Sequence, residues 1–150
     1  MGLDRSKFRH GTRLHVRSYE IDSQGIVHNA NHLLYFELGR LSYLERLGVK
    51  VDLALLQGDT KVVVVRNEID YRSPARFGEE LEVLTRIAYI RDTSFAFEGI
   101  IEEVTSRRLV SENVSIHVWL ENSTGKPKRV AEDFRRMVRA FEGPFMQFPA

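Results

Sequence analysis

The feature that most constrains the fold is one long amphipathic helix pattern over residues 30–47 of this 150-residue chain. Its apolar positions recur at the i, i+3 or i+4 spacing of a helical stripe: Ala30, Leu33, Leu34, Leu38, Leu41 and Leu44. Asn29 is a favourable N-cap residue, and Gly48 is a favourable residue just beyond the C-terminal end. Further apolar side chains flank the stripe: Tyr35, Phe36, Tyr43 and Leu47. We therefore expect this helix to be covered on more than one face.

Strand patterns fill most of the remaining chain. Residues 12–19 alternate in polarity, with Leu14 and Val16 on one face, and predict a first strand. A segment without a clear pattern, residues 52–60, is followed by four more strand patterns, over residues 61–71, 80–91, 94–104 and 107–121. Only short turns separate the last three, which is typical of an antiparallel meander. A C-terminal helix is predicted by one more apolar set: Val130, Phe134, Met137, Val138 and Phe141. Together these elements predict an α+β domain.

Length and composition limit the classes of function. A chain of 150 residues accommodates one domain with a real core but not two ordinary ones. The net charge of +1, from 22 basic and 21 acidic residues, gives no reason to expect nucleic acid as a partner. The chain has no cysteine, which excludes disulfides and thiolate catalysis and fits a cytoplasmic protein. We expect neither a signal peptide nor a membrane span, because every apolar run is too short.

Residues 19–37 contain the strongest candidate for a chemical site. Asp22 lies three residues before Gly25, and two apolar residues then lead to the predicted helix start at His28 and Asn29. A helix start offers unpaired backbone N–H groups and the positive end of the helix dipole. An acid held beside it can activate a nucleophile while the helix start stabilises an oxyanion. Taken alone, Asp22 can equally be a turn or capping residue.

Two segments together resemble a known family. The first reads Asp-x-x-Gly-[Ile/Val]-Val-x-x-x-Asn from Asp22 and continues to the aromatic–acid pair Phe36 and Glu37. The second, residues 69–81, contains Tyr71, a proline and a Phe-Gly-acid turn. Both segments resemble hotdog-fold acyl-CoA thioesterases of the 4-hydroxybenzoyl-CoA thioesterase type, a branch that includes the Tol–Pal-associated enzymes.

The resemblance implies an architecture and an assembly. It spans residues 12–141 and implies a single hotdog domain for the chain, with a central helix wrapped by a five-stranded antiparallel sheet and a C-terminal helix. One sheet around one helix leaves strand edges and apolar surface open, and the family covers them by forming homodimers or homotetramers.

The resemblance also implies hydrolysis of an acyl- or aroyl-CoA without a cofactor. Asp22 would act either as the general base on water or as a nucleophile that forms an anhydride, and its position does not separate these roles. Gly25 is expected to allow a positive φ or a close backbone approach. The backbone N–H of Asn29 maps to the family's donor to the thioester carbonyl.

Glu37 and His28 are further candidates with open alternatives. Glu37 falls within the apolar stripe, where an acid is costly unless it is paired or functional. We interpret it as a supporting acid, paired with Arg40 or an arginine of the sheet, and as the rival base. His28 either hydrogen-bonds Asp22 or substrate, or begins the helix without a catalytic role. His28 and His32 have i, i+4 spacing but lack a third ligand, so we expect no metal site.

Arg91 is the best single candidate for holding the phosphates of coenzyme A. The family commonly places a basic residue at this turn, and arginine binds phosphate through two parallel hydrogen bonds. Asp92 departs from that pattern. The other candidates are basic residues of two later turns: Arg107, Arg108, Lys126 and Lys128.

Three other functions compete with that of an acyl-CoA thioesterase. A hydratase would need a different local motif, which is not present. A non-catalytic acyl-CoA-binding module and a thioesterase acting on acyl-carrier protein both remain alternatives. The acyl group is not fixed by the sequence.

Overall fold

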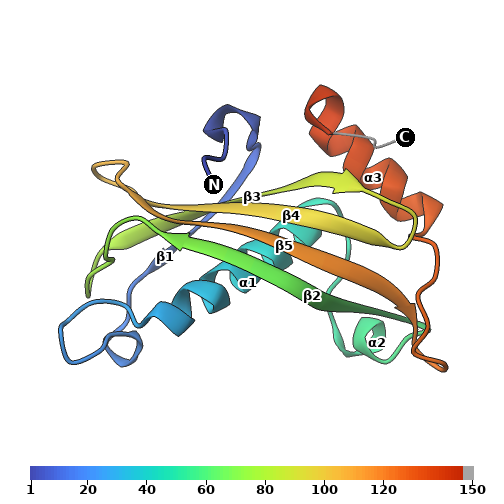
Figure 1. The fold of residues 1–150 in the computed structure, drawn as a ribbon, viewed down its shortest axis with the longest axis horizontal. Helices are drawn as coiled ribbons and strands as arrows, with labels where there is room; N and C mark the ends of the chain where they lie inside the picture. Colours follow the sequence, from blue (N-terminus) through green and yellow to red (C-terminus); the bar gives the residue numbers. More distant parts are fainter. Residues whose placement is uncertain (147–150) are drawn as a thin grey trace.

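A five-stranded antiparallel sheet that packs against one long helix organises the chain (Figure 1). The structure is a computed structural model that describes residues 1–146. Its strands are β1 (His10–His15), β2 (Thr60–Tyr71), β3 (Glu80–Ile90), β4 (Ser94–Glu103) and β5 (Leu109–Glu121). Its helices are α1 (Asn29–Arg46), α2 (Leu53–Leu56) and α3 (Glu132–Glu142), with short 3-10 turns at Arg5–Lys7, Ser18–Glu20 and Gly143–Phe145. None of the helices within residues 1–146 is long and apolar enough to cross a membrane.

The strand order is β1-β3-β4-β5-β2, so the predicted meander of the last three strands is confirmed. The first strand ends at His15 rather than at residue 19. Glu20 explains this difference, because its carboxylate accepts two hydrogen bonds from Arg17. One comes from the backbone N–H of Arg17 at 2.8 Å and the other from the guanidinium of Arg17 at 2.5 Å. These bonds turn the chain into a 3-10 turn. β5 begins at Leu109 rather than at residue 107, because Arg107 has a φ of +59° and ends the preceding turn.

The long helix has the predicted length but a different N-cap. His28, not Asn29, is the N-cap residue, and its Nδ1 accepts the backbone N–H of Ala30 at 3.1 Å. The C-terminal end is as predicted, because Gly48 adopts a φ of +93° just beyond the C-cap residue Leu47. Residues 52–60, which show no clear pattern in the sequence, contain the one-turn helix α2.

The face of α1 that meets the sheet is not the predicted one. Its buried residues are His32, Tyr35, Phe36, Gly39 and Tyr43. The predicted leucine stripe is largely exposed, with Leu34 59%, Leu38 41% and Leu41 38% exposed. We call these three residues the leucine face. The periodicity identified the helix correctly, but the side that packs on the sheet uses aromatic rings and a glycine.

Two glycines allow α1 to approach the sheet closely. A Cβ atom on Gly39 would lie 2.6 Å from both Thr85 Oγ1 and Val83 Cγ1 on β3. A Cβ atom on Gly99 of β4 would lie 2.6 Å from the ring of Phe36. Both distances are too short for any larger residue, so the helix axis is held close to β3 and β4.

α3 covers the part of β3 that β1 leaves unpaired. β1 pairs with β3 only as far as Thr85. Beyond that point the fully buried Glu142 of α3 accepts the backbone N–H of Ile87 at 3.2 Å and the hydroxyl of Tyr43 at 2.5 Å. Of the predicted apolar set of this helix, Phe134 and Val138 are buried in the core beside Tyr43, and Val130 is buried there too but precedes the helix, which begins at Glu132.

The N-terminal segment binds to the acidic side chains of three strands. The terminal ammonium group contacts Asp70 at 2.9 Å, Leu3 N–H donates to Glu112 at 2.8 Å, and Arg5 contacts Glu102 at 2.7 Å.

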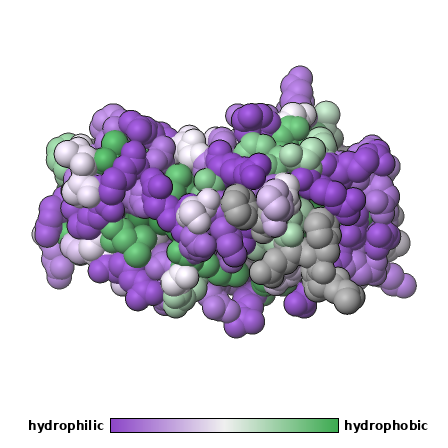
Figure 2. All heavy atoms as spheres, turned by 90° about the horizontal axis from the view of Figure 1, so that it is seen from above, coloured by the Kyte–Doolittle hydropathy of each residue, from purple (hydrophilic) through white to green (hydrophobic). Residues whose placement is uncertain are grey.

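Seen from above, the side of the molecule at the top of Figure 1 is mostly hydrophilic, with smaller apolar groups between the charged ones (Figure 2).

Candidate active site

The Asp22 motif forms a tight loop in front of α1. An antiparallel bridge between Ile21 and Val27 closes it, and Asp22 N–H donates to the carbonyl of Ile26 at 2.8 Å. Gly25 adopts a φ of +78°, which confirms the expected positive φ. The Asp22 side chain is half-buried, and its Oδ1 accepts the backbone N–H of Gln24 at 2.8 Å. Its Oδ2 accepts no hydrogen bond from any residue that the structure describes.

Hydrogen bonds from the second motif fix this loop and the helix start. The backbone N–H of Val27 donates to the carbonyl of Ala75 at 2.8 Å, which ties the loop to residues 74–76. The hydroxyl of Tyr71 donates to the carbonyl of Asn29 at 2.8 Å. Asn31, the last residue of the first motif, donates through Nδ2 to the carbonyl of Glu20 at 2.8 Å. The two motifs are therefore brought together at the start of α1.

The first turn of α1 presents an unused backbone donor, the N–H of Asn29. The N–H of Ala30 donates to His28 Nδ1, and the N–H of Asn31 donates to the His28 carbonyl at 2.9 Å. The N–H of Asn29 has no acceptor within residues 1–146. It lies at the positive end of the helix dipole, where an oxyanion is favoured.

The two histidines of this region have separate partners. His28 is exposed and caps the helix, which favours its interpretation as a helix-start residue over a contact with Asp22. His32 is only 3% exposed, and its Nδ1 shares a 2.9 Å hydrogen bond with Ser111 Oγ. Burial lowers the pKa of His32 to about 4, so its ring is neutral. Its hydrogen bond to Ser111 ties the first turn of α1 to β5. No cluster of three metal-binding side chains occurs within the described residues.

Glu20 is a supporting residue that the sequence analysis missed. Its buried carboxylate accepts the hydroxyl of Tyr35 at 2.9 Å in addition to the two donors of Arg17. Burial opposes ionisation of Glu20, but the hydrogen bonds from Arg17 and Tyr35 outweigh it and lower its pKa. The available signal was the spacing of Arg17 and Glu20, because a Glu three residues after a turn start can accept the backbone N–H of that first residue.

An open groove of about 600 Å³ runs between α1, α2 and the sheet. Phe95, Phe97 and Trp119 form much of its apolar wall, and Leu41 and Leu44 line it from α1. Its polar residues include Glu37, Arg40 and His117. The expected ion pair of Glu37 is not formed, because no cation among residues 1–146 lies within contact distance of its exposed carboxylate. Asp22 does not line this groove within one chain.

The candidates for binding coenzyme A lie at opposite ends of the sheet. Arg91 follows β3 directly, whereas the Asp22 loop lies beside the start of that strand. With 11 residues, β3 places roughly 35 Å between them. Lys126 and Lys128 share the distant end, because Lys128 N–H bonds to Trp119, whose own N–H bonds to Thr93.

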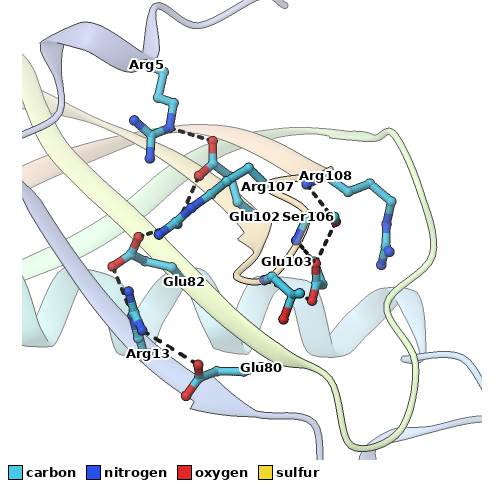
Figure 3. A network of polar contacts seen from close by, with 10 residues as sticks. Arg5, Arg13, Glu80, Glu82, Glu102, Glu103, Ser106, Arg107 and Arg108 are labelled. Carbon is cyan, nitrogen blue, oxygen red and sulfur yellow. Dashed lines mark hydrogen bonds and ion pairs between the residues drawn. The ribbon is translucent and has the colours of Figure 1, made fainter.

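Arg107 and Arg108 lie at the same end as Asp22 but are already paired. Arg107 contacts Glu82 at 2.8 Å and Glu102 at 3.4 Å, within a network of charges on the sheet (Figure 3). Arg108 contacts Glu79 at 3.0 Å. Arg91 is exposed and lies over the ring of Tyr89 at 4.9 Å.

The negative charge of Asp92 does not engage Arg91. Asp92 pairs with Arg129 at 3.0 Å instead. Lys128 pairs with Glu121 at 2.9 Å. Arg91 and Lys126 are therefore the candidates without a carboxylate partner in the part of the chain that the structure describes.

Comparison with known proteins assigns the family. Residues 16–138 match the model of a family described as the thioesterase-like superfamily. The chain belongs to this family. As a member of the thioesterase-like superfamily, the protein is a thioester hydrolase, and its fold is the expected hotdog fold.

Three relatives illustrate the match. The putative acyl-CoA thioesterase YneP of Bacillus subtilis (strain 168) is 36% identical over 129 residues, which is 86% of this chain and 92% of the relative. The chloroplastic acyl-acyl carrier protein thioesterase ATL3 of Arabidopsis thaliana is 30% identical over 134 residues, which is 89% of this chain and 69% of the relative. A crystal structure of a thioesterase from Thermus thermophilus, complexed with coenzyme A and zinc, has a TM-score of 0.79 and 31% identity, and the match covers 91% and 96% of the two chains.

Proposed function

We propose that this chain is an acyl-CoA thioesterase of the 4-hydroxybenzoyl-CoA thioesterase type and that Asp22 and the start of α1 carry the reaction. One observation above all supports the assignment of residues. The half-buried Asp22 has a carboxylate oxygen without a partner in the described chain, and the neighbouring helix start has the unused N–H of Asn29. The second motif holds the loop of Asp22 through the Val27–Ala75 backbone bond, and it holds the helix start through the hydroxyl of Tyr71.

The proposed reaction uses these two groups on opposite sides of the thioester carbonyl. The carbonyl oxygen accepts the N–H of Asn29, which stabilises the negative charge that develops on it. Asp22 removes a proton from water as the water attacks the carbonyl carbon, and the carbon–sulfur bond then breaks to release the acid and coenzyme A. In the alternative path the Asp22 carboxylate attacks the carbon, expels the thiolate, and is freed when water hydrolyses the anhydride.

A second copy of the chain completes the proposed site. The leucine face of α1 is exposed, and the edge strand β2 exposes Val62, Val64 and Val65. A homodimer, or a homotetramer of two dimers, would cover both surfaces. In the family the sites lie between copies, so we propose that Arg91 and the lysines of the distant end hold the phosphates at a site completed by a second copy.

A carrier-protein substrate is the second candidate, and the Arabidopsis relative named above favours it. The cytoplasmic location expected from the sequence stays a prediction. The deciding experiment is a turnover assay with matched acyl-CoA and acyl-carrier-protein esters of aliphatic and aromatic acids. Because the chain contains no cysteine, a thiol-reactive dye reports only the released thiol. Faster turnover of the carrier-protein esters would favour the second candidate, and no thiol release from any ester would contradict both.

A further inference from the structure

Arg40 is a partly buried cation of the groove that has no protein partner in the described chain. Arg40 projects from α1, is only partly exposed, and lines the groove. Its guanidinium makes no hydrogen bond and no ion pair with any residue of the described chain. The more deeply buried Arg86 differs, because it contacts Glu98 at 2.7 Å. An arginine that is partly removed from water normally needs such a partner.

No residue of the described chain forms an ion pair that compensates the charge of Arg40. Burial lowers the pKa of Arg40, and the carboxylate of Glu37 nearby opposes this shift without forming a contact. A guanidinium nevertheless stays charged in proteins. His117 lies in the same groove, where burial and then the charge of Arg40 lower its pKa to about 3. Its ring is therefore neutral and is stacked on Phe95 at 5.4 Å.

The wall beside Arg40 suits a carbon chain or ring. Phe95, Phe97 and Trp119 line the groove from the sheet, and Leu44 lines it from α1. A volume of about 600 Å³ is within the range of sites for small ligands. The groove thus combines an apolar wall with a partly buried, unpaired cation, Arg40, which is a pattern that fixes the orientation of a mostly apolar ligand. Lys61 also lines the groove but is exposed.

We propose that the groove binds the acyl part of the substrate and that Arg40 selects acyl groups with a second oxygen function beyond the thioester carbonyl. This inference rests on the proposed thioesterase function. The oxygen function is a carboxylate, a keto group or a hydroxyl group, all of which accept hydrogen bonds from a guanidinium. A plain alkyl or aryl group would remove water from Arg40 without replacing its hydrogen bonds. A carboxylate would replace them most completely, through two parallel bonds.

The test compares kcat/KM for matched coenzyme A esters that differ only in this oxygen. The pairs are octanoyl with octanedioyl, octanoyl with 3-oxooctanoyl, and benzoyl with 4-hydroxybenzoyl. We expect kcat/KM to be about 10- to 100-fold higher for the oxygen-bearing member of at least one pair. The member without the oxygen leaves the guanidinium of Arg40 unpaired. Arg40→Met keeps the length of the side chain and should remove the preference, mainly by raising KM for the oxygen-bearing ester. Arg40→Lys should retain part of it.

Arg136→Met is the matched control, because Arg136 lies on the exposed side of α3 and pairs with Asp133. It should leave every ratio unchanged. Calorimetry with non-hydrolysable amides gives a readout independent of turnover: the monoamide of octanedioic acid should bind the wild-type protein more tightly than octanamide, and Arg40→Met should abolish that difference.

Two results would overturn the role of Arg40 while leaving the thioesterase intact. One is an equal kcat/KM for both members of every pair in the wild-type protein. The other is an Arg40→Met variant that changes the oligomeric state but not the substrate ratios, since Arg40 would then pair with a second copy. A protein that hydrolyses none of the esters contradicts the proposed function, and the calorimetric comparison still decides whether Arg40 binds the oxygen.

Discussion

The hydroxyl of Tyr71 donates a 2.8 Å hydrogen bond to the backbone carbonyl of Asn29. This bond joins the end of the edge strand β2 to the first turn of α1, which is 42 residues away in the chain. The ring of Tyr71 also packs edge-on against His32 at 4.9 Å. Tyr71 therefore holds the helix start from which the Asn29 N–H is offered, without needing to touch the substrate itself.

Tyr71→Phe should lower kcat by about 3- to 10-fold and change KM little, because the loss of one hydrogen bond misplaces the helix start while the ring stays in place. Steady-state kinetics with a good acyl-CoA substrate measures both constants. Tyr19→Phe is the control, because this exposed tyrosine lies at the same end of the molecule and donates no hydrogen bond within the described chain. A Tyr71→Phe variant with unchanged kcat would show that the helix start does not need this bond.

The parts of the fold that follow from local patterns could be predicted. The strands β3, β4 and β5 are separated by short turns, and Gly48 marks the C-terminal end of α1. The face of α1 could not be predicted, because periodicity shows which residues share a face but not which layer covers it. Here the sheet selects Tyr35, Phe36 and Gly39, and it leaves the leucine face for another contact.

In the candidate site too, the local motif could be predicted from the sequence, but its long-range contacts could not. Asp22, Gly25 and Asn29 are close in sequence, so their motif could be read directly. Their support comes from long-range contacts such as that of His32 with Ser111, which is 79 residues away. Such contacts depend on strand register, which local patterns do not specify. The predicted meander, by contrast, already implies that Arg91 and Arg107 lie at opposite ends of the sheet, because successive turns of antiparallel strands alternate between its two ends.

Asp22→Asn should abolish nearly all turnover while preserving the fold. An asparagine can still accept the bond from Gln24 N–H through its side-chain oxygen, so the loop should stay closed. Loss of a general base typically lowers kcat by about 10²- to 10⁴-fold, and loss of a nucleophile lowers it further. Turnover of benzoyl-CoA and medium-chain acyl-CoA measures the effect. Full kcat in this variant would make Glu37 the favoured base.

The protein should be at least a homodimer, because the leucine face and the edge strand β2 are uncovered in one chain. Light scattering at micromolar concentration should give a mass of two or four chains. Leu38→Glu should produce monomers and reduce activity, because it places a charge in the interface. Ser123→Glu, in an exposed loop, should change neither property. A monomeric wild-type protein would contradict this assembly.

Gly39→Ala should destabilise the protein, although alanine is the better helix former. The intrinsic helix preference favours alanine by about 1 kcal/mol. The added Cβ would lie 2.6 Å from Thr85 Oγ1 and Val83 Cγ1, and both are β-branched residues with little freedom to move. Overpacking of this kind costs about 1–3 kcal/mol, so the net effect should be a lower midpoint of thermal unfolding. Glu45→Ala, at an exposed position of the same helix, is the control at equal protein concentration.

Arg91→Ala should raise KM for acyl-CoA several-fold and leave kcat nearly unchanged. Arg91 is exposed and has no carboxylate partner in the described chain, since Asp92 pairs with Arg129 at 3.0 Å. A phosphate contact at such a site strengthens binding through charge but is screened by salt. KM of the variant should therefore depend less on ionic strength than KM of the wild-type protein. Arg136→Ala, which removes an exposed arginine from α3, should alter neither KM nor its salt dependence. If Arg91→Ala leaves KM unchanged at low ionic strength, the phosphates bind elsewhere, and Lys126 is the next residue to replace because it too lacks a carboxylate partner within residues 1–146.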